Sequence, residues 1–207
     1  MPQKLIPVFP LQLVLFPGML LPLHIFEERY KEMIAFCLEE KESFAVTLVH
    51  HGAVMQTATL AEIVAVIKEY PDGRMDILTR GTERVTLSDV SEDASYLQAK
   101  SELLNDTSTI VTDELMGSGR KLLRQFIKQA GDTVDEEKLS TLASDELGFL
   151  LGAHGGYSLT EKQQLLEMTD AAERLNKAIQ LGRELEQRAS DEILERKPIN
   201  TNGKLPH

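Results

Sequence analysis

The sequence is poor in cysteine: Cys37 is the single one, and no CxxC pair or Cys/His spacing typical of a zinc site accompanies it. One cysteine cannot form an internal disulfide, and a single cysteine suits a reducing compartment. We therefore expect a cytoplasmic protein without a metal or a cofactor. Cys37 falls on the apolar stripe of an expected helix and has no neighbouring cation to lower its pKa, so we interpret it as a buried, inert side chain.

Basic charge is also scarce. The chain has 22 Lys and Arg against 33 Asp and Glu, which gives a formal net charge of -11. No cluster of basic residues interrupts this excess. Because a negative surface repels phosphate backbones and anionic lipid, we expect neither a nucleic acid nor a membrane as a partner.

Long uninterrupted apolar runs are missing as well. The most apolar stretch, residues 9–30 (FPLQLVLFPGMLLPLHIFEERY), is broken by Pro10, Pro17, Pro22 and Gly18. Prolines at these positions would break a helix, and the run is too short to span a bilayer, so a signal peptide and a transmembrane helix are both disfavoured. We instead predict a strand over 11–16, a turn, and a second strand over 20–26.

What the sequence does contain is enough apolar residue, 42% of 207 residues, to build one or two compact domains. Apolar residues at i, i+3, i+4 and i+7 predict an amphipathic helix over 27–40. Short β-rich runs with turn signals between them follow. The predicted strands are residues 44–49, 60–70, 74–79, 84–87 and 96–104. With a single helix inserted early, they favour a mainly antiparallel barrel or folded sheet.

The β signal ends near residue 105, and helical periodicity follows. One helix is predicted around residues 115–130, and Thr133 with Glu136 has the spacing of a capping box for a second. Thr160 with Gln163 predicts another cap, opening one long helix over 161–188. We therefore divide the chain into a strand-rich subdomain at 1–105, a helical bundle at 106–192 and a disordered tail at 193–207.

Signals of catalysis are weak. Ser118 and Lys121 are spaced as neighbours on a helix, but nothing in the sequence indicates an oxyanion hole or a desolvated lysine. His24, His50 and His51 lack the spacing of a metal site, and adjacent histidines on a strand point to opposite faces. A phosphate loop GxxxxGK[ST] and a GxSxG elbow are both missing from the sequence. We predict no catalytic and no metal-binding residue.

Several blocks of residues carry a family resemblance. Ile6-Pro7-Val8-Phe9-Pro10-Leu11, the Phe16-Pro17-Gly18 turn, and Leu21-Pro22-Leu23-His24-Ile25-Phe26-Glu27 with Arg29-Tyr30 resemble the opening signature of the substrate-recognition domain of the ATP-dependent Lon protease. Later segments are similar to its hairpin and to its helical part: 72–74, 81–85, 161–167 and 173–175. The resemblance covers about residues 4–190 and implies an α+β fold, a PUA-like, mainly antiparallel β-barrel with an early inserted helix, followed by a C-terminal helical bundle with one long helix.

The same resemblance implies a function. A complete Lon protease needs an ATPase module and a Ser-Lys peptidase module, and neither motif set is present in this sequence. We expect a stand-alone, non-enzymatic protein- or peptide-binding module. Two alternatives stay open: RNA binding through the PUA-like barrel, and a small-molecule or hydrolytic pocket between barrel and bundle.

Candidate binding residues follow from position and side-chain type. Met19, Leu20, Met55 and Tyr70 lie at expected turns and strand ends, where methionine and tyrosine suit adaptable contacts. Glu27 and Arg29 lie beside the apolar stretch, where a charge is costly unless paired, so we expect them in a structural ion pair. The expected partners are unfolded or hydrophobic protein segments and a separate protease or chaperone. The oligomeric state stays open between a monomer and a weak dimer.

Overall fold

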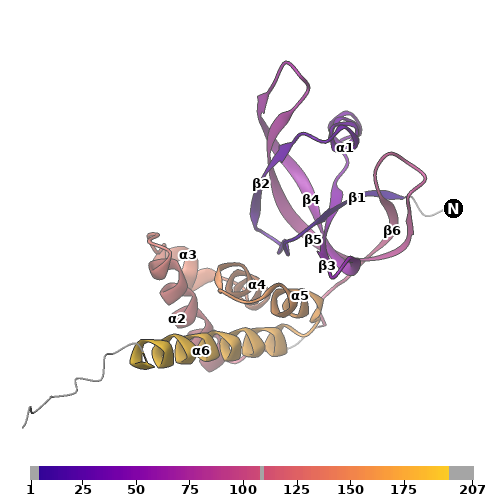
Figure 1. The fold of residues 1–207 in the computed structure, drawn as a ribbon. Coiled ribbons are helices and arrows are strands. Elements are labelled where there is room, and N and C mark those ends of the chain that lie inside the picture. The colour runs from indigo at the N-terminus through magenta and orange to yellow at the C-terminus, as the bar shows by residue number, and fades with distance from the viewer. Residues whose placement is uncertain (1–4, 108–109, 196–207) are drawn as a thin grey trace, which may run out of the picture.

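The computed structural model describes residues 5–107 and 110–195, in a strand part followed by a helical part. The strand part comprises β1 (Ile6–Leu11), β2 (Leu20–Ile25), α1 (Glu28–Glu40), β3 (Phe44–His50), β4 (Ala53–Glu69), β5 (Met75–Ser91) and β6 (Gln98–Leu103). The helical part comprises α2 (Asp113–Gln129), α3 (Glu136–Thr141), α4 (Ser144–His154), α5 (Leu159–Glu167) and α6 (Ala171–Glu195). Figure 1 shows α6 running along the outer side of the helical part, away from the strands.

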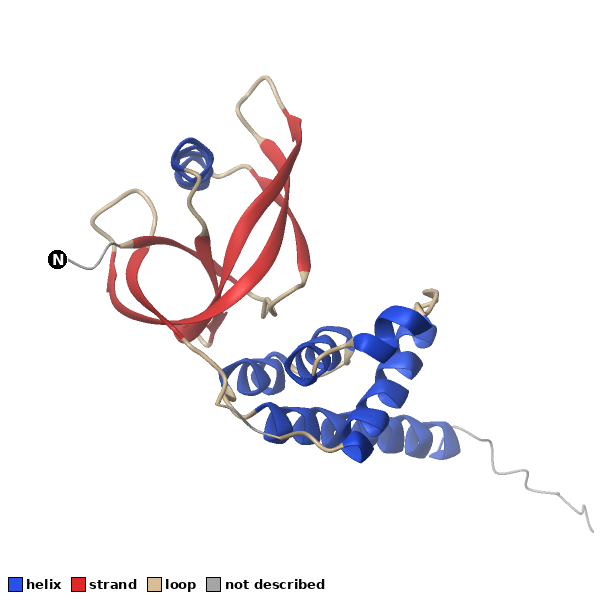
Figure 2. Ribbon diagram, turned by 180° about the vertical axis from the view of Figure 1, so that it is seen from behind, coloured by secondary structure: helices blue, strands red, loops and turns tan. Residues whose placement is uncertain are grey.

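The strands form one six-stranded sheet in the order β2-β5-β4-β3-β1-β6. β1 and β3 pair in parallel, and the other pairings between these six strands are antiparallel. Because β6 also pairs with β5, the pairings β5-β4-β3-β1-β6-β5 form a closed circuit, and β2 is attached to β5 outside it. Figure 2 shows these strands curling round into a ring above the helices. The structure is thus mixed α and β, with the strands first and the helical part after them.

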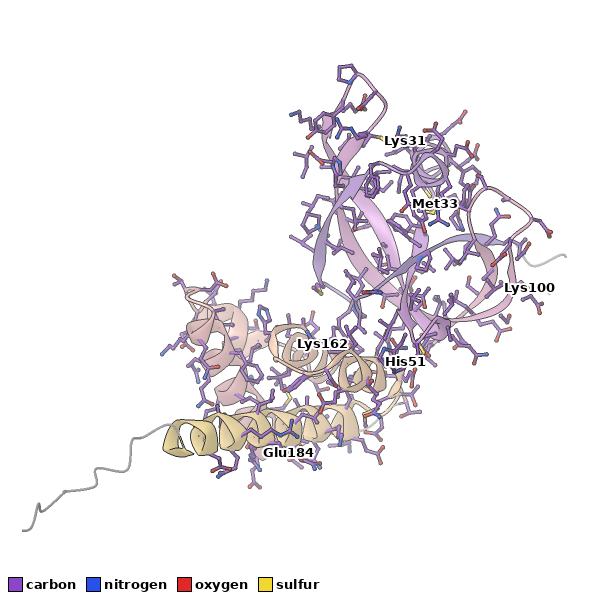
Figure 3. All side chains as sticks on the ribbon, viewed as in Figure 1. Lys31, Met33, His51, Lys100, Lys162 and Glu184 are labelled. Atoms are coloured by element: carbon purple, nitrogen blue, oxygen red, sulfur yellow. The ribbon has the colours of Figure 1, made fainter. Side chains whose placement is uncertain are left out.

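Helix α1 closes one side of the strand part. Its buried side chains Tyr30, Met33, Ile34 and Cys37 recur at helical spacing, as the predicted helix over 27–40 requires. Met33 is fully buried and lies between α1 and the strands (Figure 3). Burial raises the pKa of the Cys37 thiol to about 12, so the thiolate is not formed near neutral pH.

The predicted strand over 11–16 is wrong. β1 occupies Ile6–Leu11, and residues 12–19 form a loop that leads to β2. Val14 and Phe16 of this loop belong to the apolar core of the helices, whereas Leu15 belongs to the core under α1. The Phe16 ring lies against Gly152 of α4, where a Cβ would stand 2.6 Å from it. The apolar residues of the loop are buried because the loop inserts between the strand part and the helical part. The sequence pattern of a buried strand cannot be distinguished from this arrangement.

The two short strands predicted at 74–79 and 84–87 are one continuous strand, β5. Gly81 lies at its centre, where a Cβ would stand 2.5 Å from the Phe16 carbonyl oxygen. This glycine marks a close approach of the loop to the strand, so the interruption between the two predicted strands does not exist. β4 also begins earlier than predicted, at Ala53.

The helix caps differ from the predicted ones. Asp135, rather than Thr133, accepts the Lys138 amide at the start of α3. Ser158 and Glu161, rather than Thr160 and Gln163, form the capping box of α5. The single helix predicted over 161–188 is divided, because the chain turns at residues 168–170 between α5 and α6. Of the tail predicted from 193, residues 193–195 belong to α6 and 196–207 lie outside the described residues.

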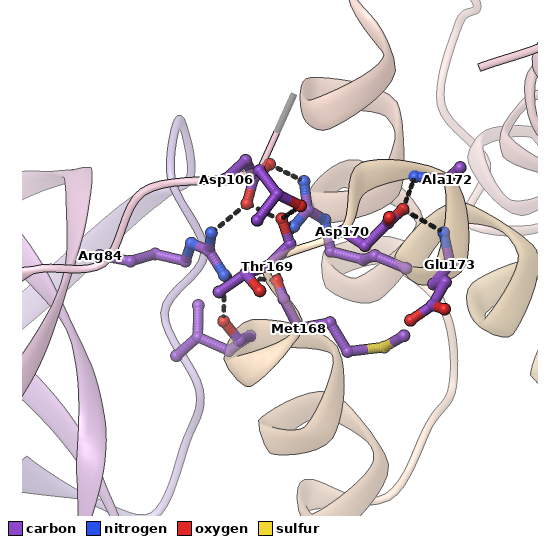
Figure 4. Close-up of polar contacts among 10 residues, drawn as sticks. Arg84, Asp106, Met168, Thr169, Asp170, Ala172 and Glu173 are labelled. Atoms are coloured by element: carbon purple, nitrogen blue, oxygen red, sulfur yellow. Dashed lines mark hydrogen bonds and ion pairs between the residues drawn. The ribbon is translucent and has the colours of Figure 1, made fainter. Parts of the chain in front are cut away.

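A buried ionic network joins the strand part to this turn (Figure 4). Asp106, after β6, pairs with Arg84 of β5 and Arg174 of α6, whose side chains are 4% and 0% exposed. Both guanidinium groups lie over the Phe149 ring, at 5.1 and 4.0 Å. Arg84 also donates to the carbonyl oxygens of Leu166 (2.6 Å) and Met168 (2.7 Å). The network therefore satisfies the carbonyl groups at the end of α5 and fixes the helices on the sheet.

Among the helices of the described residues, none combines the length and the apolar character needed to cross a membrane.

We predict that Asp106→Asn destabilises the fold by about 3–5 kcal/mol, because it leaves two buried guanidinium charges without a carboxylate. Urea unfolding followed by circular dichroism measures the change. The control is Glu62→Gln, which removes a half-exposed pair with Arg80 at 3.6 Å and should cost at most about 1 kcal/mol. An equal loss of unfolding free energy in both variants would contradict the conclusion that Asp106 anchors the helices on the sheet.

Candidate functional site

An apolar groove of about 330 Å³ opens on the strand part between β1, β2 and the first turn of α1. Its walls are mainly aromatic and aliphatic: Phe9, Leu11, Leu23, Ile25, Phe26 and Tyr30. A larger groove of about 450 Å³ lies between α2 and α6, but most of its lining side chains are charged or polar, among them Glu114, Glu173 and Arg183. Binding sites in proteins are mostly apolar concavities with a few polar groups at the rim. The groove beside β2, named the β2 groove below, is therefore the candidate site.

Aromatic side chains form the floor and one lip of the β2 groove. Phe9 lies on the floor with its ring 4.3 Å from Tyr30 and 6.0 Å from Phe44. Phe26, between β2 and α1, is 60% exposed and stacks on the His24 ring at 6.0 Å. A large apolar side chain exposed at the edge of an apolar hollow gains free energy when a ligand covers it.

Glu27 and Arg29 form a charged rim at the start of α1. Their side chains pair at 2.8 Å and are 42% and 52% exposed. Arg29 also lies over the Tyr30 ring at 4.5 Å, and burial raises the pKa of the Tyr30 phenol. The two residues are thus brought together in the structure. Such an exposed pair contributes little to stability, so its structural role stays a prediction.

A polar cluster lies at the other side of the β2 groove. His24 Nδ1 lies 2.6 Å from Asp76 Oδ1, and the Tyr70 hydroxyl donates to Asp76 Oδ2 at 2.8 Å. The hydrogen bond with His24, followed by that from Tyr70, lowers the pKa of the Asp76 carboxyl from its ordinary value. Tyr70 further packs edge-on against the His24 ring, under the cations of Lys68 and Arg74. This cluster fixes the orientation of His24, which lines the groove.

The four residues predicted to bind a partner do not form one surface. Tyr70 contacts the rim of the β2 groove through His24 and Asp76. Leu20 is 50% exposed at the first position of β2, and Met19 is half-buried against the core under α1. Met55 is half-buried against the core of the helices. Their role in binding stays a prediction.

Phe9, Leu11 and Phe26 line the groove but are not among the binding residues predicted from the sequence. They come from segments separated by the loop 12–19, and apolar residues at strand ends are usually part of a core. One available signal was Phe26 itself, a large apolar side chain directly before the charged sequence Glu27-Glu28-Arg29.

Two of the histidines, His50 and His51, and the pair of Ser118 and Lys121 lie outside the β2 groove, whereas His24 lines it. His50 ends β3 and His51 has a positive φ of 50° in the following turn, so their rings lie 4.1 Å apart. The expectation that they point to opposite faces is wrong, because they do not share a strand. Within the described ranges, no three His, Cys, Asp or Glu side chains are grouped to hold a metal ion. Ser118 and Lys121 line a polar groove between α2 and α6.

Comparisons with known proteins give one consistent result. The family profile of the ATP-dependent protease La (LON) substrate-binding domain matches residues 5–182. The chain is 30% identical over 186 residues to a Lon protease from Xanthomonas oryzae pv. oryzae and 27% identical over 185 residues to that of Escherichia coli K12. Each alignment covers 82% of this chain but only 22% and 23% of the relative, so the chain spans less than a quarter of the length of these curated relatives.

Solved structures agree on the fold. The crystal structure of a Lon N-terminal domain protein from Xanthomonas campestris is similar with a TM-score of 0.69 and 22% identity, over 84% of this chain and 96% of that one. The N-terminal domain of a Mycobacterium avium complex Lon protease is similar with a TM-score of 0.68 and 20% identity, over 86% and 98%.

We predict that Tyr70→Phe raises the pKa of Asp76, because it removes one hydrogen bond to the carboxylate while keeping the ring. Carboxyl ¹³C chemical shifts followed through an acid titration measure this pKa. Because the folded pKa of Asp76 is depressed, its stabilising effect is present above the unfolded pKa of about 3.9 and is lost as the pH falls through the folded value. The variant should therefore be less stable than the parent at pH 7, and the difference should shrink as the pH falls through the folded pKa of Asp76.

Asp72 provides an internal control for this titration. Its pKa is lowered mainly by a hydrogen bond from the Arg74 amide, which Tyr70→Phe leaves in place. The pKa of Asp72 should stay constant in the variant. A constant pKa of Asp76 would show that the phenol does not hold its carboxylate.

Proposed function

Because the chain belongs to the family of the LON substrate-binding domain, we propose that it is a non-catalytic module that binds protein or peptide segments in the β2 groove. The observation that carries the proposal is the exposed Phe26 beside a floor of Phe9 and Tyr30. An apolar groove of this size accommodates one or two large side chains of a ligand.

Unfolded or hydrophobic segments are the proposed ligands, since folded proteins bury the side chains that the β2 groove would bind. The net charge of -11 favours segments with basic flanks over acidic ones. The same charge disfavours RNA as a ligand. We propose that a separate protease or chaperone receives the bound segment.

We also propose a description of the architecture that supports this binding. The closed circuit of β5, β4, β3, β1 and β6 would be a PUA-like barrel within a subdomain at 1–105, and the helices would form a bundle subdomain at 106–192. In this description the barrel carries β2 and the β2 groove. The helices are attached to the barrel through the Asp106 network. A cytoplasmic location is part of the proposal, in line with the single buried thiol of Cys37.

We predict that Phe26→Ala weakens binding of an unfolded polypeptide roughly tenfold, because it removes an apolar side chain that becomes buried when the ligand binds. The probe is a reduced and carboxymethylated polypeptide with a fluorescent label, titrated at low salt and followed by fluorescence anisotropy. Because Phe26 is exposed in the free protein, the thermal midpoint of unfolding should stay close to that of the parent.

The matched control is Ile67→Ala on β4, which truncates an apolar side chain of similar exposure, 63%, that does not line the β2 groove. Its affinity should equal that of the parent. Equal weakening by both variants would place the binding elsewhere, and failure of the parent chain to bind any unfolded polypeptide would refute the proposed function.

A further inference from the structure

β2 has a free edge. It pairs with β5 on one side, from Leu20↔Arg80 to Ile25↔Met75 without a register shift, and it has no strand on its other side in the described part of the chain. The β2 groove begins at this free edge, since Leu23, His24 and Ile25 line it together with residues 9–11 of β1. An unpaired edge beside an apolar hollow combines backbone hydrogen-bonding groups with a place for side chains.

The direction of the backbone groups follows from the register. The Gly81 amide donates to the Met19 carbonyl oxygen at 2.9 Å, so this carbonyl of residue 19 faces β5 at the start of the pairing. In an antiparallel ladder hydrogen-bonded pairs alternate with non-hydrogen-bonded pairs, which turns the backbone groups of Leu21, Leu23 and Ile25 toward β5. The amides and carbonyls of Leu20 and His24, and the carbonyl of Pro22, then face outward from the sheet.

Prolines occupy outward-facing positions on both sides of the groove. Pro22 is at the centre of the free edge, where its missing N–H removes no bond to β5. On β1, the Val8 amide donates to Leu97 at 2.8 Å, so Pro10, two residues later, also faces away from β3. Prolines on exposed edges limit uncontrolled strand pairing. Only two donors, the amides of Leu20 and His24, remain on the edge of β2.

The positions of these prolines distinguish two partners that could pair with the free edge of β2: a second copy of the chain and an extended segment of another protein. A second copy of the chain pairing antiparallel through β2 would bring one Pro22 from each chain to the new pairing, and neither proline has an amide to donate. An extended segment of another protein loses only the one bond that Pro22 cannot donate. Its alternate side chains on the inner face would lie over the groove floor of Phe9, Leu11 and Tyr30.

We propose that β2 binds its ligand by strand addition: an extended segment with apolar side chains at alternate positions and basic flanks pairs with Leu20, Pro22 and His24. This inference rests on the proposed function and specifies its mode of binding. Basic flanks are favoured because the chain carries a net charge of -11. Because the backbone carries part of the recognition, different sequences with this alternation bind to the same edge.

The test uses a synthetic peptide, KTLTFTLTK, with capped ends and a fluorescent label, and the full chain. In an extended peptide the amides of the Leu and Phe residues point to one side and those of the Thr residues to the other. N-methylation of one set should therefore weaken binding at least tenfold, while N-methylation of the other set should change it less than threefold. Equal effects of the two sets would overturn strand addition.

Amide hydrogen exchange, measured by NMR with the unmodified peptide, locates the added strand. Exchange of the Leu20 and His24 amides should slow at least tenfold on binding, whereas the Leu21 and Leu23 amides should be protected with and without peptide. If unfolded polypeptides bind but these two amides do not change, strand addition is wrong and the proposed function stands. If no unfolded polypeptide binds either, the proposed function itself fails.

Discussion

The carboxylate of Asp106 is the constraint on which the arrangement of the two parts depends. It lies at the end of the strand part and neutralises guanidinium groups from β5 and α6, both buried from water. Burial lowers the pKa of Arg84, and the carboxylate opposes this effect by favouring the charged form. A buried charge without its partner is strongly destabilising. The helices are therefore held at one position on the sheet, and the turn between α5 and α6 is built around the same ion pairs.

This anchoring has a consequence for the β2 groove. β5 carries Arg84 near its middle and supports β2 through Met75–Arg80, so a single long strand connects the ionic network to the strand with the free edge. The loop before β2 is held as well, because Phe16 is inserted against Gly152 and the Thr59 hydroxyl donates to the Leu15 carbonyl at 2.6 Å. A site supported by rigid elements needs little ordering on binding, which favours affinity.

The sequence predicts those features that depend on local pattern. The period of apolar residues located α1, and the prolines of the opening stretch excluded a membrane helix. Gly81 shows where local reasoning fails, since a glycine inside a strand signals either a break or a close approach, and only the position of Phe16 decides between them. The partners of Asp106 lie 22 and 68 residues away in the chain, a separation that no periodicity encodes. Likewise, the β2 groove exists because the loop 12–19 separates β1 from β2.

A free strand edge beside an exposed apolar groove would ordinarily favour aggregation. Here the two prolines remove donors from the facing edges of β1 and β2, and the ion pair of Glu27 with Arg29 places charge at the rim. In the proposed mode of binding, the remaining edge offers only the Leu20 and His24 amides as donors to another copy of itself. A ligand with suitable side chains gains the missing free energy from the groove. Affinity then requires both the backbone and the side chains of the ligand, and this joint requirement separates extended apolar segments from folded surfaces.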